Sequence, residues 1–174
     1  DELDFARATA LPVQGLTAYG LAHASTRLEA GSRALVHAAA GGVGAMLVQL
    51  LQHRGVSVFG TASTPAKRDL VHQLGATPLA YGPTLPAEIM ALTEGRGVDA
   101  VFDSVGGPTQ EESLASLGLY GQLVCFGDSG GPPAPIHPDA LYPRNLSVSS
   151  FWLAADPPER WAAARERLQA MVLE

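Results

Sequence analysis

A turn rich in glycine and alanine, from His37 to Gly44, is the part of this sequence best suited to chemistry. It joins a predicted strand to a predicted helix and matches the pattern G-x-G-x-x-G, except that Ala39 replaces the first glycine, while Gly41 and Gly44 fill the other places. Small residues let the backbone approach a pyrophosphate, and the helix N-terminus attracts its charge. The turn therefore predicts a dinucleotide site; the alternative is a glycine turn that only closes a helix onto a sheet.

The segment after the second predicted strand, Gly60 to Arg68, indicates which dinucleotide. An NAD site usually presents a carboxylate to the adenosine ribose about 20 residues after the glycine turn begins. Here the first carboxylate is Asp69, whereas Ser63 and Lys67, with Arg68 as a further candidate, offer the hydroxyl and cations that suit a 2′-phosphate. We therefore predict NADP(H). The alternative is that Ser63 caps a helix and the two cations form a solvated face.

Apolar segments of strand length alternate with segments of helical period, which is typical of stacked βαβ units. We predict one α/β domain over residues 1–174, with a doubly wound parallel sheet of Rossmann type, six strands and the order 3-2-1-4-5-6. A loop rich in glycine and proline is predicted over Gly127 to Pro143. The predicted strands are Arg33–His37, Val56–Thr61, Pro78–Tyr81, Asp99–Phe102, Gly121–Phe126 and Leu146–Leu153. The predicted helices are Phe5–Ala10, Val13–Ser25, Val43–Arg54, Pro65–Leu74, Leu85–Thr93, Thr109–Leu117 and one from Pro158.

Charge and composition exclude several classes of partner. The net charge of −6 at pH 7 disfavours nucleic acid and anionic membrane, and no stretch reaches the roughly 18 consecutive apolar residues of a membrane span. The single cysteine, Cys125, fits a reducing compartment, so we expect a soluble cytoplasmic protein. Five scattered histidines show no metal-ligand spacing, and no metal site is predicted.

Five other side chains are assigned structural roles. We expect His37 and Asp103 to form hydrogen bonds near the strand ends rather than to transfer protons. Cys125 is expected to be a small core residue rather than a nucleophile. Tyr19 and Tyr120 are expected to pack rather than to act as acids.

Five segments in this order resemble the cofactor domain of a known family: Gln14–Tyr19, Leu35–Gly44, Gly60–Ser63, Gly95–Asp99 and Asp103–Gly107. The chain is similar to zinc-independent medium-chain dehydrogenase/reductases, in the quinone oxidoreductase and enoyl reductase branch. The resemblance extends from about Ala8 to Trp152. It implies a subunit in which a GroES-like substrate domain flanks this one and NADPH lies between them.

The resemblance also implies roles for individual residues. Thr17 would lie near the nicotinamide and its phosphates, and Ser63 and Lys67 would hold the 2′-phosphate. Tyr81 would lie beside the adenosine end. The pyrophosphate would be cradled by Ala40, Gly41, Gly42 and Val43, and the crevice above the sheet would be lined by Ser104, Val105, Gly106, Phe126 and Gly127.

The activity implied is hydride transfer from NADPH to a quinone or an activated enone. Hydride addition to an enone builds charge on a carbonyl oxygen, and no convincing donor for that oxygen is found in this sequence. The chain begins at Asp1 rather than methionine, so we expect a piece of a longer protein that lacks the substrate domain, binds NADPH and turns over little. The sixth strand is a candidate dimer edge.

Two alternatives to an oxidoreductase are considered. One is a non-catalytic module that binds NADP(H) for a sensing or structural role, and nothing in the glycine turn separates it from the enzyme. The other is a methyltransferase using S-adenosylmethionine, which shares this sheet. Ser63 argues against the methyltransferase, because that class normally has an acidic residue at the end of the second strand.

Overall fold

The computed structural model describes Thr9 and residues 11–173, and a sheet of six parallel strands forms its centre. The strands lie in the order β3-β2-β1-β4-β5-β6, which confirms the predicted doubly wound sheet and its topology. Their bounds are β1 (Arg33–Val36), β2 (Ser57–Thr61), β3 (Thr77–Leu79), β4 (Val98–Asp103), β5 (Leu117–Cys125) and β6 (Ser147–Ser150).

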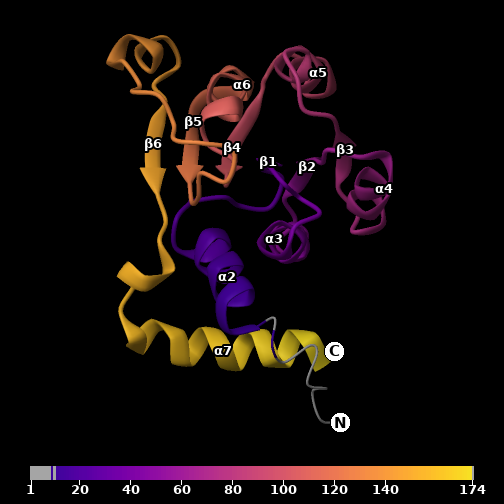
Figure 1. The fold of residues 1–174 in the computed structure, drawn as a ribbon, viewed down its shortest axis with the longest axis vertical. Helices are drawn as coiled ribbons and strands as arrows, with labels where there is room; N and C mark the ends of the chain where they lie inside the picture. The colour runs from indigo at the N-terminus through magenta and orange to yellow at the C-terminus, as the bar shows by residue number, and fades with distance from the viewer. Residues whose placement is uncertain (1–8, 10, 174) are drawn as a thin grey trace.

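Helices cover both faces of this sheet (Figure 1). One face is covered by α2 (Leu16–His23), α3 (Gly42–His53) and α4 (Pro65–Gln73), and α7 (Pro158–Leu173) packs against α2. The other packs against α5 (Leu85–Leu92) and α6 (Gln110–Ser116). Shorter helical segments are η1 (Leu11–Gly15), η2 (Gly107–Thr109), η3 (Pro138–Ala140), η4 (Tyr142–Arg144) and η5 (Leu153–Ala155).

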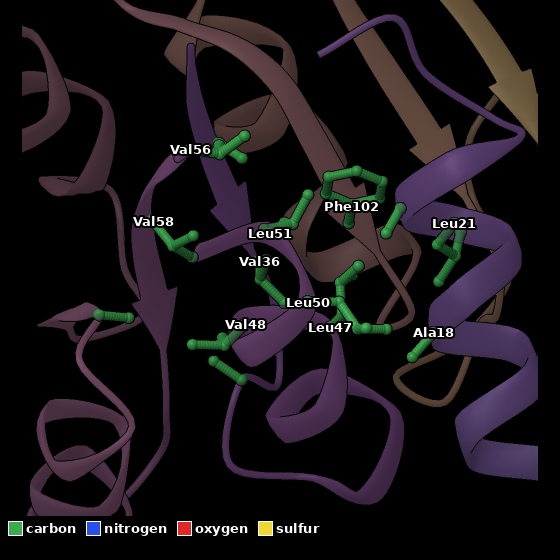
Figure 2. Packing of buried hydrophobic residues seen from close by; sticks show 14 of the residues in the cluster. Ala18, Leu21, Val36, Leu47, Val48, Leu50, Leu51, Val56, Val58 and Phe102 are labelled. Atoms are coloured by element: carbon green, nitrogen blue, oxygen red, sulfur yellow. The ribbon is translucent and has the colours of Figure 1, made fainter. Parts of the chain in front are cut away.

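The apolar stripe of α3 fixes this helix to the sheet. Leu47 and Leu51 are fully buried and belong to the same core cluster as Val36 of β1, Val58 of β2 and Phe102 of β4 (Figure 2). Burying each such side chain contributes roughly 1.5–3 kcal/mol relative to exposure. The packing therefore holds the N-terminus of α3 at a defined place beside the end of β1.

Because all strands run parallel, their carboxyl ends lie at one edge of the sheet. These ends are Val36, Thr61, Leu79, Asp103 and Cys125 for β1 to β5. The chain leaves β1 toward β2 on one side and later returns to place β4 on the other side. Open parallel sheets bind ligands outside the carboxyl ends at such a reversal of strand order.

The fifth strand departs from its predicted bounds. It begins at Leu117 rather than Gly121, and the pairing with β4 is irregular: Leu117 lies opposite Val98, whereas Gln122 already lies opposite Ala100. The extra residues form a bulge in which Tyr120 has a φ of 59° and is 72% exposed. The prediction that Tyr120 is a packing residue is therefore wrong, because the side chain lies in the bulge and is exposed to solvent.

The ends of the fold also differ in detail from the predictions. The predicted helix Val13–Ser25 is divided into η1 and α2, and the strand predicted over Leu146–Leu153 is shortened to β6. The predicted loop Gly127–Pro143 contains the short turn η3 and part of η4. The helix predicted over residues 5–10 lies, apart from Thr9, outside the described residues. Within the described part of the chain, no helix combines the length and apolarity needed to cross a membrane.

Candidate cofactor-binding site

The glycine turn leaves the N-terminus of α3 open to a ligand. Gly41 occupies the N-cap position with φ −80° and ψ 170°, and no side chain accepts a hydrogen bond from the first turn of the helix. At Gly44, an added Cβ would lie 2.3 Å from the carbonyl oxygen of Ala38, so the helix can approach the turn this closely only with glycine. Free amides and the positive end of the helix dipole together suit a phosphate group.

The alanine that replaces the first glycine of the pattern is accommodated by a neighbouring strand. Ala39 is fully buried, and its amide donates to the carbonyl oxygen of Thr61 at 3.0 Å. A Cβ added at Gly60 of β2 would lie 2.7 Å from the Cβ of Ala39. The absence of a side chain at Gly60 thus provides the room that Ala39 occupies in the turn.

Tyr81 contacts the turn directly. Its hydroxyl accepts a hydrogen bond of 2.8 Å from the amide of Ala38, which has a φ of 51°. Its ring stacks on His37 with the centroids 5.8 Å apart and the planes at 13°. Tyr81 therefore supports the backbone of the turn from the side of β3, next to the position where the resemblance places the adenosine.

The side chains expected to hold a 2′-phosphate follow the end of β2. Ser63 and Lys67 are exposed, and the cap of α4 is Thr64, whose Oγ1 accepts from the amide of Lys67 at 3.3 Å. Ser63 is therefore not the cap that the alternative interpretation required. Arg68 is half-buried, and its guanidinium donates to the carbonyl oxygen of Ala62 at 3.2 Å.

The loops after β4 and β5 are joined at the same edge of the sheet. The amide of Phe126 donates to the carbonyl oxygen of Asp103 at 2.9 Å. The amides of Ser129 and Gly130 donate to the carbonyl oxygens of Ser104 and Val105 at 3.1 and 2.7 Å. The predicted residues Ser104, Val105, Gly106, Phe126 and Gly127 thus form one connected wall, on the opposite side of β1 from Ser63 and Lys67.

Thr17 lies half-buried on α2, which packs against α3. A neighbour in the same segment, Gln14, was not assigned a role from the sequence. A Cβ added at Gly42 would lie 2.4–2.5 Å from the Gln14 side-chain amide, so the side chain of Gln14 lies beside Gly42 and leaves no room there for a larger residue. Gln14 lies in the π-helical segment η1, a local geometry that is frequent at functional sites.

Below the loops, His37 and Asp103 form a buried polar network, as predicted for both. His37 Nδ1 lies 2.9 Å from Thr61 Oγ1, and its Nε2 lies 3.0 Å from Ser113 Oγ. Ser113 Oγ donates to Asp103 Oδ2 at 2.9 Å. Burial lowers the pKa of His37 to about 4, an effect that the nearby Asp103 charge only partly offsets. His37 is thus neutral at pH 7, with both ring nitrogens occupied.

Cys125 is half-buried at the end of β5 rather than fully in the core. Burial, together with the charge of Asp103, raises the pKa of its thiol.

Among the described residues, no three His, Cys, Asp or Glu side chains gather closely enough to hold a metal ion, so these residues do not form a zinc site.

Comparisons with known proteins agree with this geometry. A quinone oxidoreductase of Pseudomonas aeruginosa is 34% identical over 180 residues, covering 99% of this chain and 54% of the relative. A 2-haloacrylate reductase of Burkholderia is 36% identical over 137 residues, covering 78% of this chain and 41% of the relative. The crystal structure of Escherichia coli quinone oxidoreductase complexed with NADPH superposes with a TM-score of 0.89 at 30% identity, covering 98% of this chain and 54% of that one.

The chain thus spans about half the length of these relatives or less. The family model described as zinc-binding dehydrogenase matches residues 42–170, from the first residue of α3 into α7. Since this match covers well over half of the chain, the protein belongs to the zinc-binding dehydrogenase family.

Proposed function

We propose that this chain is the NADPH-binding domain of an oxidoreductase that transfers a hydride to a quinone or an activated enone. The observation that carries the proposal is the uncapped N-terminus of α3 behind a turn of small residues, at the edge where the strand order reverses. The names of the relatives support it, since they reduce quinones or a haloacrylate and one contains NADPH.

The residues present fit NADPH along the length of the edge. The amides of Gly42, Val43 and Gly44 would donate hydrogen bonds to the pyrophosphate, and Ala40 and Gly41 lie in the turn just before them. Exposed Ser63 and Lys67 would hold the 2′-phosphate, where no carboxylate opposes it. The wall of Ser104–Gly106 with Phe126 and Gly127 would lie along the nicotinamide half, because it is on the other side of β1.

We propose that the described residues bind and orient NADPH and take no chemical part in the hydride transfer. NADPH supplies the hydride when bound, and the protein holds it with one face toward the substrate and excludes water. His37 is not available as a proton donor to a substrate, because it is buried with both ring nitrogens bonded. We propose that the donor for the substrate oxygen comes from a GroES-like domain of the parent protein or from solvent.

An experiment on this chain separates binding from turnover. NADPH is titrated first, followed by NADPH oxidation with a soluble quinone and with an enone. The proposal predicts saturable NADPH binding with little or no oxidation, and oxidation by a parent protein carrying the substrate domain. Fast oxidation by this chain alone would refute the missing donor. Tight binding with no oxidation by the parent, across acceptors, would favour the sensor or structural module.

Three further features of the parent are proposed. The edge strand β6, where Val148 is 38% exposed, would pair with a second copy to form a dimer. The unpaired cysteine is consistent with the cytoplasm. We expect a small-molecule substrate and no nucleic-acid partner, given the net charge of −6 at pH 7.

A further inference from the structure

The hydrogen bonds of the buried network under the strand ends have one direction. The Asp103 carboxylate has no proton to donate, so Ser113 must use its only hydroxyl proton on Asp103 Oδ2 at 2.9 Å. The contact of 3.0 Å between Ser113 Oγ and His37 Nε2 then requires a proton on Nε2. Neutral His37 therefore accepts at Nδ1 from the hydroxyl of Thr61, 2.9 Å away.

This direction makes Asp103 the final acceptor in the series of hydrogen bonds that runs from Thr61 through His37 and Ser113. Asp103 is 2% exposed, and its carboxylate accepts hydrogen bonds from several donors. Oδ1 accepts from the amides of Val105 and Gly106 at 2.8 and 3.1 Å, and the hydroxyl of Thr109 lies 2.8 Å from Oδ2. The network thus connects the end of β2 with the loop after β4, and it passes through His37, the first residue of the glycine turn.

We propose that Asp103 is a positioning residue that holds the Val105–Gly106 backbone against the nicotinamide half of NADPH. Ser113 and His37 act through Asp103, because they fix the orientation of its carboxylate. The inference rests on the proposed function. The strand order indicates which half of the cofactor would lie near Asp103. The adenosine side of the edge lies over β2 and β3, whereas the loop held by Asp103 follows β4, across β1.

Because the two halves of the cofactor lie over different strands, a fragment of the cofactor separates a local effect from a general one. The test compares dissociation constants for NADPH and for 2′,5′-ADP, which lacks the nicotinamide half. Ser113→Ala removes the hydroxyl that joins His37 to Asp103. Ser116→Ala is the matched control, because Ser116 is fully buried on the same helix and its hydroxyl donates to the Glu112 carbonyl at 2.7 Å, outside the network of His37 and Asp103.

We expect Ser113→Ala to raise the Kd for NADPH about five- to tenfold, the size expected for one lost hydrogen bond. Its Kd for 2′,5′-ADP should stay within about twofold, and Ser116→Ala should leave both constants within the same limit. Equal weakening of both ligands by Ser113→Ala, no weakening at all, or the same weakening in Ser116→Ala would overturn the inference. If the unaltered chain bound neither ligand, the proposed function itself would fail.

A second measurement does not depend on the cofactor. Two-bond ¹H–¹⁵N correlation spectra of the unaltered chain should show His37 as the Nε2–H tautomer. In Asp103→Asn, the introduced amide would donate to Ser113, and the Ser113 hydroxyl would turn to His37 Nε2. The His37 proton should then move to Nδ1. An Nδ1–H tautomer in the unaltered chain, or an unchanged tautomer in the folded variant, would refute the assigned direction.

Discussion

The close approach of Ala39 in the turn to Gly60 on β2 can be tested by substituting both residues. In Gly60→Ala, the new Cβ would lie 2.7 Å from both the Ala39 Cβ and Val71 Cγ1. Ordinary carbon contacts begin near 3.5 Å, so each neighbour would have to move by most of an ångström. Overpacking of this kind in a close-packed core costs about 1–3 kcal/mol in the free energy of unfolding.

Ala39→Gly removes one of the two obstructing carbons. Alone it should cost about 1 kcal/mol, from a lost buried methyl group and greater freedom of the unfolded chain. Combined with Gly60→Ala, it should restore about 1 kcal/mol relative to the sum of the single effects, while the contact with Val71 keeps the rescue partial. Urea unfolding of the four proteins measures this coupling. If the two changes in the free energy of unfolding added to within about 0.5 kcal/mol, residues 39 and 60 would not be in steric contact, and the explanation would be wrong.

Three further predictions concern single side chains. Lys67→Glu should weaken NADPH binding about ten- to a hundredfold and leave NADH binding nearly unchanged, and equal losses for both would show that Lys67 does not contact the 2′-phosphate. Because the folded pKa of His37, about 4, is below its usual 6.5, the unfolded chain takes up this proton first as the pH falls from about 6.5 to 4, and stability falls with it. The chain should lose about 2–3 kcal/mol more between pH 7 and pH 4.5 than His37→Gln in urea unfolding, and parallel pH profiles would contradict this. Since burial raises the pKa of the Cys125 thiol, iodoacetamide at pH 8 should modify the folded chain far more slowly than the urea-unfolded chain, and equal rates would refute that environment.

The topology and the position of the glycine turn between β1 and α3 are predictable from the sequence because they depend on local patterns. Apolar strand segments and the stripe of α3 indicate the sheet, and the segment rich in glycine and alanine from His37 to Gly44 indicates the turn. The bulge that exposes Tyr120 was not predictable, because it depends on the pairing of β5 with β4, a contact between distant residues. The role of Gly60 was hidden for the same reason, since its partner Ala39 lies on another segment.

The buried network was predictable only in part. The strand-end positions of His37 and Asp103 indicated structural hydrogen bonds, and both form them. Ser113 lies on a helix expected from its period alone, and nothing in its sequence neighbourhood indicates that it joins the two. Gln14 was missed because its contact with Gly42 joins two segments and leaves no local sequence pattern.

A crystal structure of this chain with NADPH tests the central claim most directly. The account predicts the pyrophosphate within hydrogen-bond distance of the amides of Gly42 to Gly44, the 2′-phosphate beside Ser63 and Lys67, and the nicotinamide along the loop after β4. Crystals that exclude NADPH at millimolar concentration, or a nucleotide bound away from the N-terminus of α3, would contradict it.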